Sequence, residues 1–167
     1  MINKIVEKLN ELPQDLLNQL LDLVRDSSQV ILIGNGGSNA IASHIAVDYL
    51  KFLGKKSIAL TDASLITAYM NDYGVEYSYR KYLESMTDDK TLVILISSSG
   101  NSKNIYYAAE YCKYLHRNFV ILTGFDKDNL VRKTFKNDAK IDYWVDSNSY
   151  GVIECVHQIF LHSIINN

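Results

Sequence analysis

The sequence predicts an α/β fold: a three-layer sandwich with a five-stranded parallel sheet, preceded by N-terminal helices. Five short apolar runs rich in β-branched residues alternate with stretches of helical spacing, which is typical of βαβ units. The runs are continuously apolar, as expected for strands that helices cover on both faces. The length of 167 residues suits one domain with a sizeable core.

Two helices are expected before the first strand, because apolar residues recur at helical spacing over residues 2–25 and Pro13 interrupts the pattern. We expect one domain over residues 1–167, in which residues 1–27 are an N-terminal helical segment. The predicted strands then follow in order, at residues 30–34, 57–60, 91–97, 119–124 and 141–145.

Helical spacing follows most of these strands, and the segment between the second and third strands is less regular. Residues 61–86 predict a loop and one or two short helices, with turn-forming residues at 71–74 (Asn-Asp-Tyr-Gly). The other predicted helices cover residues 40–52, 102–115, 128–135 and 150–165.

The composition excludes several classes of protein. Seventeen basic and nineteen acidic residues give a net charge of −2, so there is no electrostatic case for nucleic acid binding. No apolar run of about eighteen residues occurs, and the charged N-terminus is unlike a signal peptide, so we expect no membrane contact. Two cysteines do not make a disulfide scaffold and fit a reducing compartment. We therefore expect a soluble cytoplasmic protein.

Two loops follow predicted strands and have the chemistry of anion binding. Residues 34–38 read Gly-Asn-Gly-Gly-Ser, and glycines let backbone N–H groups approach a ligand closely. Residues 97–102 read Ser-Ser-Ser-Gly-Asn-Ser and precede a helix, whose N-terminus attracts anions. In sheets of this class, ligands bind outside the carboxyl ends of the strands.

Either loop alone is also compatible with a tight turn or a helix cap. The nucleotide motifs do not match, because Asn39 replaces the third glycine of G-x-G-x-x-G and no phosphate-loop lysine is present. Taken together, the two loops favour a phosphorylated small molecule. A phosphate held by hydroxyl and amide groups alone is more consistent with a monophosphate ester than with a triphosphate bound to magnesium.

Histidines and carboxylates near these loops are the candidate acid–base or metal groups. His44 and Asp48 lie four residues apart and share one face of the predicted helix. Glu154 and His162 lie eight residues apart on the last predicted helix and can border one cleft. Without the loops, a His–Asp pair at this spacing is more often a solvated helix pair than a site, and His162 would ordinarily be a core histidine.

Four stretches resemble the sugar isomerase (SIS) domain family, and within it the phosphoheptose isomerase subfamily. They are residues 34–48, 60–74, 96–105 and 153–162. The resemblance implies a flavodoxin-like SIS fold and a homotetramer with active sites between subunits. It also implies an aldose–ketose phosphosugar isomerase. The expected reaction converts sedoheptulose 7-phosphate to D-glycero-D-manno-heptose 7-phosphate for lipopolysaccharide or capsule.

The same resemblance implies roles for individual residues. Asp48 and His162 inherit proton transfer, and some family members bind zinc at the positions of His44, Asp48, Glu154 and His162. Contacts to the sugar phosphate are implied for Asn35, Gly36, Gly37, Ser38, Asp62, Asn71, Asp72, Ser97, Ser98, Ser99, Asn101, Ser102 and Glu154.

The chain also departs from the family pattern. Asp48 replaces a glutamate, Glu154 replaces a glutamine, and Gly151 and Val152 stand where the family has an aspartate and an arginine. Two other functions therefore stay open: a non-catalytic phosphosugar-binding protein and a tetramer that binds a replication initiator. Catalysis predicts that His44, Asp48, Glu154 and His162 share one cleft, whereas a binding role predicts a large exposed apolar or acidic patch.

Overall fold

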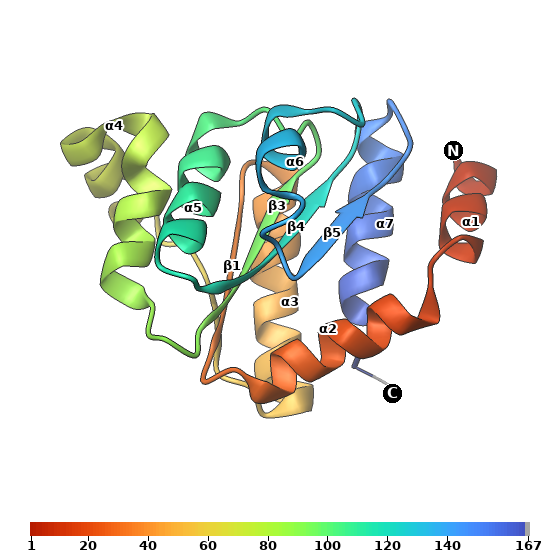
Figure 1. The fold of residues 1–167 in the computed structure, drawn as a ribbon, viewed down its shortest axis with the longest axis horizontal. Helices are drawn as coiled ribbons and strands as arrows, with labels where there is room; N and C mark the ends of the chain where they lie inside the picture. The colour runs from red at the N-terminus through yellow and green to blue at the C-terminus, as the bar shows by residue number, and fades with distance from the viewer. Residues whose placement is uncertain (166–167) are drawn as a thin grey trace.

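A computed structural model describes residues 1–165. Five parallel strands form one sheet in the order β2-β1-β3-β4-β5 (Figure 1). This order confirms the predicted parallel α/β fold, and it is that of the flavodoxin-like class. The strands are β1 (Val30–Gly34), β2 (Ser57–Ala59), β3 (Leu92–Ser97), β4 (Asn118–Thr123) and β5 (Ile141–Trp144).

Helices cover both faces of the sheet and form the outer layers of the sandwich. They are α1 (Ile2–Asn10), α2 (Gln14–Asp26), α3 (Gly37–Leu53), α4 (Ala63–Met86), α5 (Lys103–Tyr114), α6 (Leu130–Phe135) and α7 (Tyr150–His162). Apolar side chains of α2, α3 and α7 pack on one face of the sheet, and those of α4, α5 and α6 pack on the other.

Successive strand residues point to opposite faces, which explains the continuous apolar runs. In β1, Val30 and Leu32 belong to the core under α3, whereas Ile31 and Ile33 belong to the core under α5. All five residues of β1 are buried.

The predicted break at Pro13 separates α1 from α2. The segment at residues 61–86 contains α4, and its two helical pieces confirm the predicted one or two helices. Gly74 interrupts its helical geometry with φ 76° and ψ 157°, so two helical pieces meet at a kink. The turn chemistry at residues 71–74 marks this kink.

Helix α1 lies apart from the sheet and packs against α7 (Figure 1). Its Ile5 and Leu9 contact a small apolar cluster that includes Val152 and Ile153 of α7. Among the described residues, no helix is both long and apolar enough to span a bilayer.

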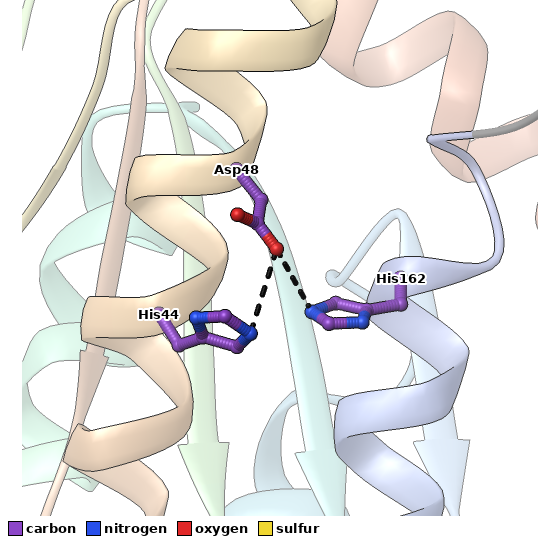
Figure 2. Close-up of side chains that lie close together, drawn as sticks. All are labelled: His44, Asp48 and His162. Carbon is purple, nitrogen blue, oxygen red and sulfur yellow. Dashed lines mark ion pairs between the residues drawn. The ribbon is translucent and has the colours of Figure 1, made fainter.

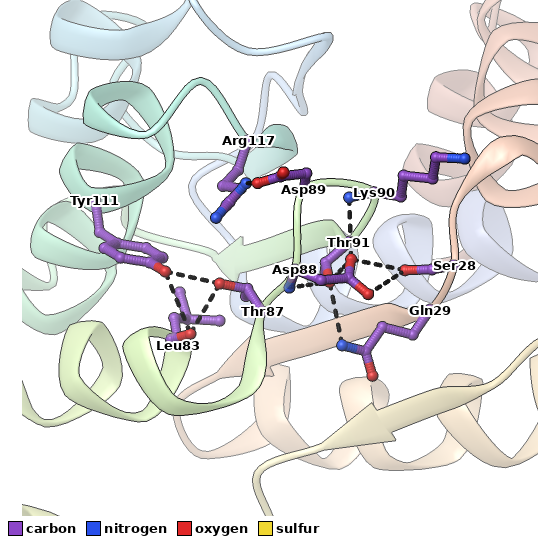
Figure 3. A network of polar contacts seen from close by, with 10 residues as sticks. All are labelled: Ser28, Gln29, Leu83, Thr87, Asp88, Asp89, Lys90, Thr91, Tyr111 and Arg117. Carbon is purple, nitrogen blue, oxygen red and sulfur yellow. Dashed lines mark hydrogen bonds and ion pairs between the residues drawn. The ribbon is translucent and has the colours of Figure 1, made fainter.

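A polar network fixes the amino ends of β1 and β3, at the end of the sheet away from the two ligand loops (Figure 3). The Ser28 and Thr91 hydroxyls each donate to the Asp88 carboxylate at 2.8 Å. The hydrogen bonds from Ser28 and Thr91 keep the pKa of the Asp88 carboxyl below its usual value, and Gln29 donates to Thr91 Oγ1 at 3.1 Å. The network holds the two central strands in register.

Candidate active site

The two loops identified in the sequence lie side by side because their strands are neighbours. β1 and β3 pair in parallel, and Gly34 lies opposite Ile96. The chain runs from β1 outward to β2 and then returns to the other side of β1 for β3. The two loops therefore leave the sheet in different directions at this switch point, which is where such sheets bind ligands.

A cavity of about 260 Å³ opens between the loops. Serines and glycines predominate among its lining residues, and no lysine or arginine of the described part of the chain lines it. Its lining residues are Asn35, Gly36, Gly37, Ser38, Ile96, Ser97, Ser98, Ser99, Ser102, Tyr150 and Glu154.

The serine loop turns sharply at Gly100, which has φ 63°. A Cβ atom there would lie 2.0 Å from Asn129 Oδ1, so only glycine allows Asn129 to pack against the turn. The Gly100 N–H donates to Ser97 Oγ at 3.2 Å. This packing directs the next residues toward the start of α5.

Two hydroxyls of this loop are available to a ligand. Ser98 Oγ is buried and has no hydrogen-bond partner among residues 1–165, although Ser98 lines the cavity. Ser102 is the N-cap residue of α5, yet its side chain makes no capping hydrogen bond. A buried hydroxyl without a partner costs free energy, and a phosphate oxygen would remove that cost.

Glu154 also lines the cavity and lies beside the start of α3. A Cβ on Gly37 would be 2.6 Å from Glu154 Oε2, so the carboxylate packs directly against the first residue of that helix. A carboxylate at a helix N-terminus interacts favourably with the helix dipole. It also repels a second anion there, which leaves the N-terminus of α5 as the better place for a phosphate.

A second group of chemically active side chains lies further along α3 and α7 (Figure 2). His44 Nε2 lies 3.5 Å from Asp48 Oδ2, and His162 Nε2 approaches the same oxygen at 3.2 Å from α7. One ligand atom from each residue lies within 4.8 Å of the others. The Asp48 side chain is 15% exposed and that of His44 is 52% exposed, so the cluster opens on one side.

The donor set of this cluster suits a divalent metal ion. Despite the short distance to Asp48, His162 Nε2 makes no hydrogen bond within the described part of the chain, so its lone pair is available to a cation. Imidazole nitrogens and a carboxylate oxygen are common zinc ligands, and three of them leave a fourth position open.

Several predicted site residues lie elsewhere. Glu154 is absent from the His44–Asp48–His162 cluster, because two helical turns, about 12 Å, separate it from His162 on α7. The four-residue zinc set is therefore not assembled within this chain.

Three predicted substrate contacts, Asp62, Asn71 and Asp72, do not line the cavity. Asp62 instead caps α4 by accepting the Leu65 N–H at 2.9 Å, and Asn71 and Asp72 are exposed. Asn101 accepts the Leu130 N–H at 2.9 Å and likewise lies outside the lining.

Three residues of this region were not identified from the sequence. Tyr150 lines the cavity and packs edge-on against Phe125, with ring centroids 4.7 Å apart. Tyr79 and Asn104 hydrogen-bond to Asn35 from two different helices. Tyr150 could have been found as the first residue of the last helix, but no sequence signal indicates the other two.

His157 is buried on α7 and belongs to the core rather than to the site. Its Nε2 lies 3.1 Å from the carbonyl oxygen of Thr123, and burial lowers the pKa of the imidazole to about 4. A carbonyl only accepts hydrogen bonds, so the proton of the neutral ring is on Nε2.

Comparison with known proteins identifies the family. The family model described as "SIS domain" matches residues 1–124. The chain belongs to the SIS domain family. Phosphoheptose isomerase of Helicobacter pylori (strain P12) is 31% identical over an alignment of 167 positions, and the alignment covers 96% of this chain and 84% of the relative.

Two solved structures have the same SIS fold. A phosphoheptose isomerase from Francisella tularensis has a TM-score of 0.85 and 26% identity, over 99% of this chain and 90% of that one. Phosphoheptose isomerase from Neisseria gonorrhoeae has a TM-score of 0.88 and 24% identity, over 99% of this chain and 91% of that one. The second likeness concerns the fold alone.

Proposed function

We propose that this SIS-family chain is a phosphoheptose isomerase. It would convert sedoheptulose 7-phosphate to D-glycero-D-manno-heptose 7-phosphate, a precursor for lipopolysaccharide or capsule. The relatives at about 30% identity carry this name. The observation that carries the proposal is the arrangement of α3 and α7: their first turns border the serine-lined cavity, and their later turns carry the His44–Asp48–His162 cluster.

The serine loop would bind the phosphate. Ser98 offers a hydroxyl with no hydrogen-bond partner among residues 1–165, and the Ser102 hydroxyl makes no capping hydrogen bond. The first turn of α5 offers backbone N–H groups. The serine loop would bind the phosphate equally strongly in the ground state and in the transition state. Its main contribution is therefore to hold the sugar in place rather than to lower the chemical barrier.

With no metal bound, Asp48 and His162 would transfer the protons of the isomerisation. Asp48 takes a proton from C1 while His162 gives one to the C2 carbonyl oxygen, which produces an enediol. His162 then takes the proton from the C1 hydroxyl, and Asp48 returns its proton to C2, so the aldose forms with no net change in protons. The 3.2 Å separation of their reactive atoms lets the two groups act on adjacent atoms of the sugar.

His44, Asp48 and His162 are the residues that would hold a zinc ion. When bound, the metal would supply a Lewis acid that polarises the carbonyl and stabilises negative charge on its oxygen, and Asp48 and His162 would then act as its ligands instead of proton carriers. His44 contributes a ligand from the exposed side of the cluster, one helical turn before Asp48. Glu154 would contact the substrate in the serine-lined cavity instead of the metal.

We also propose a cytoplasmic homotetramer with active sites between subunits. Residues 1–167 would form one SIS domain, with residues 1–27 as its N-terminal helical segment. Helix α3 exposes three apolar side chains, Val47, Leu50 and Phe52, each more than half exposed, and Phe52 lies one turn after Asp48. Phe52 also lines a second cavity of about 260 Å³ together with Asp48 and His162. A neighbouring subunit on this face would bury the apolar side chains and close the open side of the cluster.

The test is incubation of the purified protein with sedoheptulose 7-phosphate while NMR follows the sugar signals. Parallel samples contain added zinc or a chelator, and His162→Ala serves as the matched inactive variant. We expect aldose signals with the wild-type protein and at least a hundredfold slower appearance with the variant. An unchanged substrate spectrum under every metal condition would refute the proposed reaction.

A further inference from the structure

The amide of Asn35, in the glycine loop, is held by two buried side chains from different helices. Asn35 Nδ2 donates to Asn104 Oδ1 at 3.0 Å, and Asn104 Nδ2 donates back to Asn35 Oδ1 at 2.9 Å. The Tyr79 hydroxyl lies 2.8 Å from the same Asn35 oxygen and 3.0 Å from the Gly34 carbonyl. Tyr79 and Asn104 are only 4% and 6% exposed.

The orientation of this amide pair follows from one backbone group. The Ile105 N–H, in the first turn of α5, donates to Asn104 Oδ1 at 3.0 Å. A backbone N–H can only donate, so the Asn104 atom that faces it must be the oxygen. The Asn35 atom beside that oxygen is then the nitrogen, and the opposite pair is Asn104 nitrogen with Asn35 oxygen.

Tyr79 reinforces this orientation. Its single hydroxyl proton is shared between two acceptors, Asn35 Oδ1 and the Gly34 carbonyl oxygen, so the Asn35 atom beside it is the oxygen, which also accepts from Asn104 Nδ2. The nitrogen of Asn35 is different, because it carries two hydrogens and only one is used within the described residues, by Asn104. Asn35 lines the serine-walled cavity.

We propose that Asn104 and Tyr79 are positioning residues that make Asn35 a fixed hydrogen-bond donor to an oxygen of the bound sugar phosphate. The inference rests on the proposed function and deepens it, because it assigns a direction to the Asn35 contact. A freely rotating amide would present its oxygen instead of its nitrogen about half of the time, and that oxygen would repel a phosphate oxygen. α4 and α5 thereby couple the glycine loop to the start of the phosphate-binding helix.

The test compares Asn104→Leu and Tyr79→Phe with the control Tyr82→Phe. Asn104→Leu keeps the side-chain volume roughly constant and removes both amide contacts. Tyr79→Phe removes only the hydroxyl and keeps the packing, so it can replace Asn104→Leu in the test if that variant does not fold. Tyr82 is 3% exposed and lies one turn further along α4, and no hydrogen bond joins it to the glycine loop. KM and kcat are measured with sedoheptulose 7-phosphate.

We expect KM to rise about fivefold in Tyr79→Phe and at least about tenfold in Asn104→Leu, with kcat within about twofold of wild type. Tyr82→Phe should keep the wild-type KM. A general loss of stability would not separate KM from kcat in this way. Unchanged KM in both test variants, or an equal rise in Tyr82→Phe, would overturn the inference.

A second readout separates this inference from the proposed function. If the wild-type protein does not convert sedoheptulose 7-phosphate, the proposed function fails and the Asn35 side-chain NH₂ signals of the ligand-free protein decide. We expect one of the two protons to exchange slowly with water in the wild type and both to exchange fast in Asn104→Leu. Equal exchange in the two proteins would show that Asn104 does not hold the amide.

Discussion

His162 Nε2 lies 3.2 Å from Asp48 Oδ2 and so joins the last turn of α7 to the later half of α3. The same oxygen lies 3.5 Å from His44 Nε2, so one carboxylate serves two imidazoles (Figure 2). In the family pattern that the sequence resembles, a glutamate, one methylene longer, occupies the position of Asp48. In this chain the shorter Asp48 still reaches both histidines, so the substitution does not break the cluster.

Asp48→Asn should lower kcat by about a hundredfold or more, because the amide cannot accept the proton from carbon. The expected change in KM is small, since Asp48 does not line the phosphate cavity. Steady-state kinetics with sedoheptulose 7-phosphate measures both quantities. Asp15→Asn, an exposed change on α2, is the control and should behave as wild type. A variant at position 48 with normal turnover would exclude Asp48 as the base.

Ser102→Ala should raise KM about tenfold and leave kcat within about twofold, because a hydrogen bond to a phosphate stabilises the ground state and the transition state equally. The same kinetic assay detects the change. Ser85→Ala, on the exposed face of α4, is the matched control. A loss confined to kcat would contradict a phosphate-binding role for Ser102.

The wild-type protein should retain about one zinc ion per chain after dialysis, as measured by elemental analysis. His162→Ala should lose most of the metal, because two ligands bind zinc far more weakly than three. His116→Asn replaces an exposed histidine with positive φ by a residue that tolerates this conformation, so it should keep the metal. Equal zinc contents in the two variants would place the metal elsewhere.

His157 should make folding stability sensitive to mild acid. The pKa of its imidazole is about 4 in the folded protein and about 6.5 when unfolded, so the unfolded chain takes up a proton first as the pH falls. Stability is therefore complete above pH 6.5 and decreases by about 2 to 3 kcal/mol between pH 7.5 and 4.5.

Urea unfolding at pH 7.5 and pH 4.5 measures this loss. In His157→Gln the free energy of unfolding should be lower at pH 7.5 but should fall less on acidification than in the wild type. His116→Asn removes an exposed imidazole and should follow the wild-type pH profile. Identical pH profiles for wild type and His157→Gln would show that His157 is not the group responsible.

The amino-acid sequence predicted the fold and the places of the glycine and serine loops, because both depend on local patterns. The apolar runs fix the strands, and the glycines and serines after two of them mark the switch point. The extent of α4 was harder to predict, because Gly74 breaks the helical periodicity in its middle. A pattern along the chain describes one segment at a time, so it predicted His44 and Asp48 on one face but not their distance from His162.

Contacts between distant segments could not be predicted. Glu154 and His162 lie on one helix, yet the packing of α7 on α3 carries them to two separate groups of residues. The hydrogen bonds from Tyr79 and Asn104 to Asn35 join residues 44 and 69 positions apart. Buried polar pairs of this kind depend on tertiary packing, and tyrosine and asparagine in a helix give no local indication of it.

A crystal structure of the protein with sedoheptulose 7-phosphate tests the central claim most directly. We expect the phosphate of the sugar within hydrogen-bonding distance of Ser98 Oγ and Ser102 Oγ, with the opposite end of the sugar directed toward an Asp48–His162 pair. A phosphate bound outside the serine-lined cavity, or a cavity that stays empty at saturating concentrations of the sugar, would contradict the account.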